Sequence, residues 1–233
     1  MKPRLLVAAL GLLGSVIAAC SGSPSTSERP DIRPGAFALL PCQAHPETAC
    51  ALVVAGGKRV LIGAPAGAAS TLEPEDLRKL DQALLFSLHG EAIEGLDEIR
   101  NASWRFGRPA PLPLAGPEGT GALAAAVNLT FEQADALHVV EQGMPTGGFD
   151  AALLIGRDVD VGETGFDTGD LVITYMGPAT WEIAYQGAPS VILRGCQGPA
   201  PLPLTAEPST VIIDCMANGD RVWPLVTPRF ILR

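Results

Sequence analysis

A histidine and an acidic residue follow a short apolar run in the stretch LLFSLHGEAIEGL, residues 84–96. His89 and Glu91 offer a nitrogen and an oxygen ligand at the expected end of a buried strand, and Cys196 offers a sulfur. The competing interpretation is structural, because a lone histidine at a strand end is commonly held by backbone groups, and acids favour helix starts. We therefore predict no catalytic residue, no metal and no other cofactor, with one zinc ion on these three residues as the alternative.

The rest of the sequence is poor in catalytic motifs. The chain contains only three histidines, His45, His89 and His138. The stretch FDTGD at residues 166–170 includes the Asp-Thr-Gly triplet of aspartic proteases, but that mechanism needs two aspartates and the triplet occurs once. There is no Gly-x-Ser-x-Gly elbow and no Gly-rich loop ending in Lys-Ser/Thr. The sequence therefore argues against aspartic proteases, serine hydrolases of that type and P-loop enzymes.

The first twenty residues have the pattern of an export signal. Lys2 and Arg4 precede an apolar run at residues 5–18, and the run ends in VIAAC with Cys20. This ending resembles a bacterial lipoprotein signal, in which the cysteine becomes the lipid-carrying first residue; an ordinary cleaved signal with an incidental cysteine is the alternative. The expected divisions are a signal peptide at 1–19, a lipidated Cys20 with a flexible tether to residue 34, and a folded domain at 35–233.

The charge balance restricts the partners. The chain carries 16 Lys and Arg against 25 Asp and Glu, a formal net charge of −9, and loss of the leader would make it more negative. A nucleic acid partner is therefore disfavoured. We expect attachment to a membrane through the N-terminal lipid, in the bacterial envelope and, from Ser21 after the cysteine, at the outer membrane facing the periplasm. The sequence identifies no protein or small-molecule partner.

Four cysteines follow Cys20, namely Cys42, Cys50, Cys196 and Cys215. An even number in an exported chain predicts disulfides, and four cysteines allow three pairings. The spacing favours Cys42–Cys50 and Cys196–Cys215. A thiolate metal site is the alternative, but the four lack Cys-x-x-Cys spacing and histidine partners.

Composition and apolar patterning predict one mixed α/β domain. The chain is 47% hydrophobic and 18% charged, which is enough apolar material for a sizeable core. Strands at 51–55 and 60–62 should form a hairpin about Gly56-Gly57. A short helix should follow with Pro74 near its start.

Sequence patterns in the middle of the chain predict an edge strand followed by two helices. Prolines bound the stretch RPAPLPLAGPEGTG at 108–121, which is typical of an edge strand. A small-residue helix should follow at 121–129, and Thr130 with Gln133 should form a capping box for a second helix. Beyond residue 139 the apolar runs predict a meander of strands.

A set of short motifs also runs in a fixed order along most of the chain. They are GAFALLP, ALVVAGGKRVLIGAPAG, ALLFSLHGEAIEGLDEI, ASWRFGRPAPLPLAGPEGT, GFDTGDLVITYMG, WEIAYQGAPSVILRGC and STVIIDCM. In order, these resemble the ribonuclease Z-like branch of the metallo-β-lactamase fold over about residues 35–216. The resemblance implies an αββα four-layer sandwich, shortened at the C-terminus.

The positions at which that family holds two metal ions are changed here. Its H-x-H-x-D-H motif falls on residues 87–92, where His89 alone matches and Glu91 stands in place of the aspartate. Its metal-bridging aspartate falls on Cys196, its Asp-Cys-Gly turn on residues 63–65, and its later histidine has no counterpart at 176–179. Three histidines in the whole chain are too few for such a site.

The resemblance therefore implies a lipid-anchored, non-catalytic binding or scaffold protein that lacks most metal ligands. The alternative is a weak or altered metal-dependent hydrolase that uses His89, Glu91 and Cys196. Under the first hypothesis, a Cys196–Cys215 disulfide would lie where the metals lie in the family, and would supply the cross-link that coordination supplies there.

Overall fold

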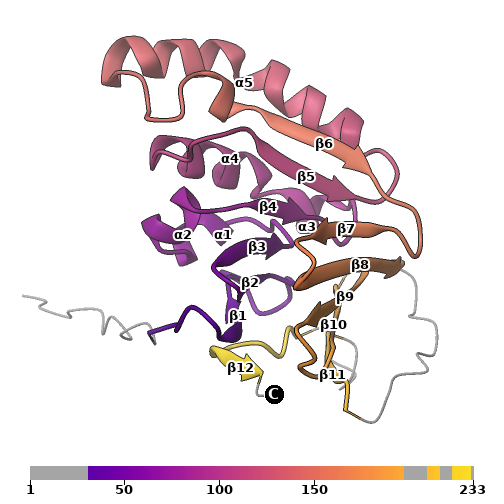
Figure 1. Ribbon diagram of the computed structural model, residues 1–233. Helices are drawn as coiled ribbons and strands as arrows, with labels where there is room; N and C mark the ends of the chain where they lie inside the picture. The colour runs from indigo at the N-terminus through magenta and orange to yellow at the C-terminus, as the bar shows by residue number, and fades with distance from the viewer. Residues whose placement is uncertain (1–30, 197–208, 216–221, 232–233) are drawn as a thin grey trace, which may run out of the picture. The chain divides into compact units, whose positions relative to one another are not determined.

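Two β-sheets pack face to face in the part of the chain that the computed structural model describes, residues 31–196, 209–215 and 222–231 (Figure 1). The larger sheet has seven strands, β1 (Phe37–Pro41), β2 (Ala51–Ala55), β3 (Lys58–Ile62), β4 (Gln82–Leu84), β5 (Leu112–Gly116), β6 (Leu154–Asp158) and β12 (Arg229–Ile231). Their spatial order is β12-β1-β2-β3-β4-β5-β6. Pairing is antiparallel from β12 to β3 and parallel from β3 to β6.

The smaller sheet follows in the sequence. Its five strands are β7 (Thr164–Asp167), β8 (Leu171–Gly177), β9 (Thr180–Tyr185), β10 (Val191–Arg194) and β11 (Val211–Asp214), in the spatial order β11-β10-β9-β8-β7. The pairs are antiparallel except β10 with β11, which run parallel. Strands β7 to β10 form the antiparallel meander predicted for the second half of the chain, whereas β6, from the start of the predicted stretch, belongs to the larger sheet and β11 is parallel to β10.

The helices all precede β7. They are α1 (Ala68–Thr71), α2 (Pro74–Arg78), α3 (Gly90–Ile93), α4 (Leu96–Arg105), α5 (Thr120–Gln142) and the 3₁₀ turn η1 (Asp150–Ala152). Buried residues of α1, α2, α4 and α5 pack on the outer face of the larger sheet, and Trp104 of α4 packs with Ala151 and Ala152 of η1 in a smaller cluster. From β7 onward the described residues contain no helix. The predicted α/β class, with two packed sheets and helices outside them, is confirmed.

Two apolar cores explain why the strands of the larger sheet are hydrophobic on both faces. One face of β2 and β3 packs against the smaller sheet, through side chains such as Val53 and Val60. The other face packs against the helices, through side chains such as Leu52 and Leu61. All four are 0% exposed. A sheet buried on both faces reads as continuous apolar runs, as these strands do.

The β2–β3 hairpin forms as predicted. Gly56 and Gly57 have φ angles of +57° and +77°, and Ala55 pairs with Lys58 across the turn. Positive φ at both central residues is the requirement of the two-residue turn that matches strand twist, and glycine meets it without steric strain.

The prediction of an edge strand at 108–121 is wrong, because β5 lies between β4 and β6. Pro113 is tolerated there for a specific reason. Pairing with β4 begins only at Leu114, so the missing N–H of Pro113 has no β4 residue opposite it. The neighbouring Leu112 N–H donates toward β6, to the carbonyl of Leu153 at 2.9 Å.

The prediction of two successive helices is also wrong, because α5 runs unbroken from Thr120 to Gln142. The Thr130 hydroxyl donates to the carbonyl of Ala126 at 2.8 Å, one turn back, and does not cap a new helix. A threonine inside a helix can satisfy its hydroxyl in this way, so the capping-box pattern alone did not determine a helix boundary.

Buried arginines join α4 to its neighbours. Arg100 Nη1 donates to Asp135 on α5 at 2.9 Å, and Nη2 contacts the second oxygen of that carboxylate. Arg108 donates to Ser103 Oγ at 3.1 Å and to the carbonyl of Ala151 at 2.6 Å. Burial, with a smaller contribution from the charge of Arg100, lowers the pKa of Arg108 from its ordinary value to about 10. These contacts fix α4, α5 and η1 at one end of the larger sheet.

Candidate functional site

The loops that carry the expected metal-ligand positions follow β3, β4 and β10, and the ring of Phe86 lies where they meet. A Cβ atom placed on Gly63, just after β3, would lie 3.3 Å from Phe86 Cδ2. One placed on Gly195, just after β10, would lie 2.9 Å from Phe86 Cβ. Phe86 is only 1% exposed. An aromatic side chain therefore fills the space between these strand ends.

A disulfide joins Cys196 to Cys215 just beyond the parallel strands β10 and β11. The two Cα atoms are 5.1 Å apart, and the residues are 3% and 1% exposed. Both belong to the apolar core between the sheets, together with Phe86. The sulfur of Cys196 is thus bonded to another sulfur and presents no thiolate to a metal ion.

Two tryptophans complete this packing. Trp181 Nε1 donates to the carbonyl of Leu85 at 3.1 Å, and Trp223 Nε1 donates to the carbonyl of Cys50 at 3.1 Å. The Trp223 ring meets Phe86 edge-on, with centroids 6.0 Å apart. Both indoles are 0% exposed and have their N–H groups paired, so the aromatic cluster is satisfied without a ligand.

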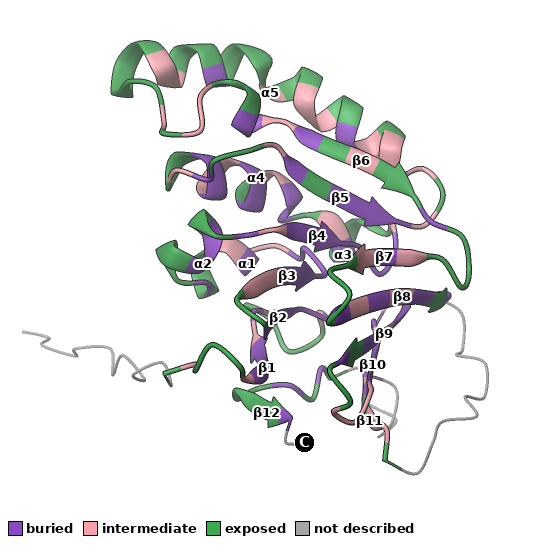
Figure 2. Ribbon diagram, viewed as in Figure 1, coloured by how far each residue is buried: buried purple, intermediate pink, exposed green. Residues whose placement is uncertain are grey.

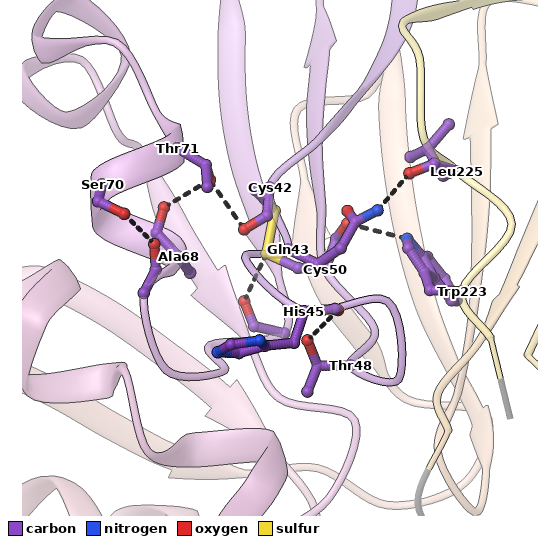
Figure 3. The surroundings of a disulfide bond; sticks show 12 residues. Cys42, Gln43, His45, Thr48, Cys50, Ala68, Ser70, Thr71, Trp223 and Leu225 are labelled. Atoms are coloured by element: carbon purple, nitrogen blue, oxygen red, sulfur yellow. Dashed lines mark hydrogen bonds between the residues drawn. A yellow bond between two sulfur atoms is a disulfide. The ribbon is translucent and has the colours of Figure 1, made fainter. Parts of the chain in front are cut away.

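The Cys42–Cys50 disulfide secures the loop against which Trp223 packs (Figure 3). From α1, Thr71 Oγ1 donates to the carbonyl of Cys42 at 2.9 Å. From the loop itself, Gln43 Nε2 donates to the carbonyl of Leu225 at 2.8 Å, and Figure 3 shows this contact on the side away from Thr71. The loop therefore ties α1 to the segment that brings Trp223 into the core. Both disulfides favoured by the cysteine spacing are present.

His89 and Glu91 lie at the surface, outside this apolar packing. His89 directly precedes α3 and is exposed, with its Nδ1 3.3 Å from Ser87 Oγ. Glu91 is exposed in the first turn of α3, where a carboxylate is favoured by the helix dipole. The expectation of a histidine held at a buried strand end is thus wrong in one respect, because the apolar run buries Phe86 and ends before His89.

These residues do not fit a zinc ion. A zinc site needs three or four nitrogen, sulfur or oxygen donors at about 2.0–2.3 Å. Cys196 is consumed by its disulfide, which leaves His89 and Glu91. Within residues 31–196, 209–215 and 222–231, no three His, Cys, Asp or Glu side chains gather in a way that would hold a metal. No step of a metal-dependent reaction can be derived from this arrangement.

The amino end of α5 is occupied by a carboxylate of the chain itself. Asp158, at the end of β6, accepts the backbone N–H of Gly121 at 2.8 Å and of Gly119 at 3.0 Å. These hydrogen bonds hold the pKa of the Asp158 carboxyl below its ordinary value. A helix amino end is a ready anion site, and here an internal side chain uses it.

The remaining candidates lie elsewhere. His45 is exposed in the 42–50 loop, and His138 lies on α5 with its ring centroid 5.3 Å from that of Trp104. The three histidines therefore belong to three separate elements. In the FDTGD stretch, Asp167 accepts the N–H of Gly169 at 2.6 Å, which is a turn contact and not half of a protease dyad. Cys20 and the leader lie outside the described residues.

Neither protein-family models nor curated proteins give a match to this sequence. Among solved structures, the chain is similar to the metallo-beta-lactamase fold protein YhfI from Bacillus subtilis, at 16% identity over 68% of this chain and 62% of that one, with a TM-score of 0.45. It is also similar to human tRNase Z, short form, at 14% identity over 71% of each chain, with a TM-score of 0.48. The chain thus spans less than two thirds of the first of these proteins.

These likenesses concern the fold alone, so the activity of neither protein is transferred to this chain. The sandwich described above follows from the strand order and the two cores of this chain itself. The residues that sequence patterns missed are Phe86, Trp181 and Trp223. The available signal was rarity, since the chain has three tryptophans and two of them fill this one place.

Proposed function

We propose that this chain is a lipid-anchored, non-catalytic protein of the bacterial cell envelope that binds or positions a partner on a metallo-β-lactamase-like sandwich. The observation that carries the proposal is the content of the strand-end site. Phe86, Trp181, Trp223 and the Cys196–Cys215 disulfide occupy it, and each is almost fully buried. These packed side chains and the disulfide support a structural role for the site.

The chemistry of the neighbouring groups supports the same proposal. Metal-dependent hydrolysis needs an activated water molecule and a general base within hydrogen-bond distance of that water. His89 is exposed beyond the apolar cluster, and its contact is a serine hydroxyl. The alternative, an altered hydrolase using His89, Glu91 and Cys196, would require the disulfide to be open.

The lipid anchor rests on the sequence. VIAAC ending at Cys20, followed by a Ser- and Pro-rich tether, supports attachment by a lipid, and residues 35–233 then form the exported domain. Among the described residues, no helix combines the length and the apolar character needed to cross a bilayer. Cys20→Ala should release the chain from the membrane fraction, and intact mass should find a diacylglyceryl group on the native chain only. If the native chain and Cys20→Ala were found in the membrane fraction to the same extent, the proposed lipid anchor would be wrong.

The proposal that the protein is non-catalytic is tested by measuring its metal content. The full chain, purified from an oxidising compartment without chelator, should carry less than about a tenth of an equivalent of zinc, manganese or iron. Near-stoichiometric metal that is lost in His89→Ala but kept in His45→Ala would overturn the proposal. His45 is the matched control because it is also an exposed loop histidine.

A further inference from the structure

Two neighbouring connections of the larger sheet present apolar side chains to solvent (Figure 2). Phe106, between α4 and β5, is 47% exposed, and Met144 and Phe149, between α5 and β6, are 52% and 38% exposed. The two connections are in contact, because a Cβ atom on Gly107 would lie 3.3 Å from Thr146 Oγ1. The three exposed side chains therefore belong to one surface, which we call the apolar patch.

The apolar patch lies at the edge of the sheet where the described chain begins. Strands β1, β3, β4, β5 and β6 run in one direction, since β1 and β3 both pair antiparallel with β2 and the others pair parallel. Their amino ends therefore share one edge of the larger sheet, which we call the tether edge. In Figure 1, residues 31–36, the end of α4 and the α5–β6 connection all lie on the left-hand side.

Charge distinguishes the tether edge from the opposite edge of the sheet. At the carboxyl ends of β4, β5 and β6, residues 85–98, 117–119 and 159–163 contain seven Asp and Glu and no Lys or Arg. Arg157 on β6 pairs with one of these acids, Glu163, at 2.9 Å. An anionic surface therefore repels the carboxyl-end edge.

The tether edge has no such excess of acids. Three acidic and three basic residues are found in the connections that precede its strands, namely 31–36, 56–57, 79–81, 106–111 and 143–153. An anionic lipid surface can therefore approach this edge without net repulsion from the connections. Charge and exposed apolar side chains thus favour the same edge as a contact with lipid.

We propose that the tether edge rests on the lipid bilayer that carries the anchor, with the apolar patch in the headgroup region. This proposal rests on the lipid anchor proposed above. Asp31 follows Cys20 by eleven residues, which span no more than about 40 Å even when fully extended. The anchor therefore keeps the tether edge at a high effective concentration near the bilayer, so a weak apolar contact is enough to orient the domain.

The size of the apolar patch fits an orienting role. Three partly exposed side chains can enter the boundary between headgroups and acyl chains, as the apolar residues of interfacial segments do. They are too few to hold the chain at a membrane without the lipid, in keeping with the release expected for Cys20→Ala. In this orientation the carboxyl-end edge, with the strand-end site and Glu91, faces the aqueous compartment. A soluble partner would reach that edge without meeting the bilayer.

The test places the lipidated full chain in vesicles of phosphatidylethanolamine and phosphatidylglycerol whose acyl chains are brominated near the headgroup. Bromine quenches tryptophan only at close range, and the three native tryptophans are 0% exposed. The added emission of Phe106→Trp should fall at least about twofold relative to vesicles without bromine. The matched control is Val161→Trp, because Val161 is 70% exposed just beyond the carboxyl end of β6. Its emission should not change.

Flotation of the vesicles separates the two ways in which this account can fail. A chain that does not float with the vesicles would show that the lipid anchor is wrong, and the proposed orientation with it. A chain that floats but is quenched equally in both variants, or in neither, would overturn the orientation and leave the anchor standing.

A second pair of variants tests the apolar patch itself. In the Phe106→Trp chain, Met144→Glu places a charge in the lipid contact and should restore most of the quenched emission. Val161→Glu in the same chain adds the same charge at the opposite edge and should leave the quenching unchanged. Quenching that persists in Met144→Glu, or that is lost in both chains, would contradict the contact between the apolar patch and the bilayer.

Discussion

Two buried regions of this molecule are held together by different kinds of contact. At the α4–β5 corner, the large side chains Trp104 and Arg108 of the stretch ASWRFGR are hydrogen-bonded. Trp104 Nε1 donates to the carbonyl of Gly148 at 2.9 Å, and Arg108 bonds Ser103 and Ala151. At the ends of β3, β4 and β10, the space holds aromatic rings and a disulfide.

The two regions differ in the kind of interaction that holds their elements together. The corner residues hold elements together, and removal of any one would leave a buried polar group unpaired. The strand-end residues hold elements together as well, but by apolar contact and a covalent bond. Side chains therefore pack both regions, one around charged hydrogen bonds and the other around aromatic rings and a covalent bond.

The largest loss of stability should come from breaking the buried Arg100–Asp135 ion pair between α4 and α5. Asp135→Ala would leave Arg100, which is fully buried, without its carboxylate, at a cost of about 3–5 kcal/mol in the free energy of unfolding. Glu132→Ala, at an exposed position on the same helix, should change that free energy by less than about 0.5 kcal/mol. Urea unfolding of both variants measures the difference. Equal effects would mean that the Arg100–Asp135 pair does not stabilise the corner.

Removal of each disulfide should give the next largest losses in the free energy of unfolding. Cys196 and Cys215 are 19 residues apart and Cys42 and Cys50 are 8 apart, so loop closure gives about 3 kcal/mol for the first pair and about 2.5 kcal/mol for the second. Replacing each pair by alanine should lower the free energy of unfolding in that order. A negligible loss for the Cys196→Ala/Cys215→Ala chain would show that the strand-end site does not depend on its cross-link.

Asp158 should give a smaller and pH-dependent effect. Asp158→Asn weakens the hydrogen bonds to the amino end of α5 and should lower the unfolding midpoint slightly at neutral pH. Because the folded-state pKa is depressed, the contribution of the carboxylate is complete above its ordinary value of 3.8 and is lost as the pH falls through the lower folded value. The two unfolding curves should therefore converge in acid. A gap that widens there would contradict the capping role.

The smallest effect should come from His89. Its ring is exposed and outside the aromatic cluster, so His89→Ala should change the free energy of unfolding by less than about 0.5 kcal/mol. Phe86→Ala, only three residues earlier but 1% exposed, should cost about 3–5 kcal/mol. Comparison of the two variants by urea unfolding locates the boundary between core and surface in this loop. A large loss in His89→Ala would mean that the histidine has a buried partner.

Much of the fold could be predicted from local patterns. The Gly56-Gly57 hairpin follows from turn chemistry, which needs no knowledge of distant residues. The placement of β5 inside the sheet could not, because it depends on β6 lying beside it, some forty residues later. The unbroken course of α5 is a similar case, since Thr130 satisfies its hydroxyl within the helix.

Of the groups that fill the strand-end site, the sequence predicted the Cys196–Cys215 disulfide but not the aromatic rings. The count of three histidines led to the expectation that no two-metal site is present, and this stays a prediction. The arrival of Trp223 beside Phe86 could not be predicted, because hydrogen bonds to Pro46 and Cys50 bring a distant segment of the chain into the core. Contacts between segments so far apart in sequence leave no local pattern.

The central claim is that the strand-end site is closed by packing and a disulfide and stands without metal. The most direct measurement is thermal unfolding of the full chain with and without a strong chelator, beside the Cys196→Ala/Cys215→Ala chain. We predict an unchanged midpoint in chelator and a midpoint lower by roughly 6–12 °C in the cysteine variant. A midpoint that falls in chelator, with release of stoichiometric metal, and that is indifferent to the cysteines would contradict the account.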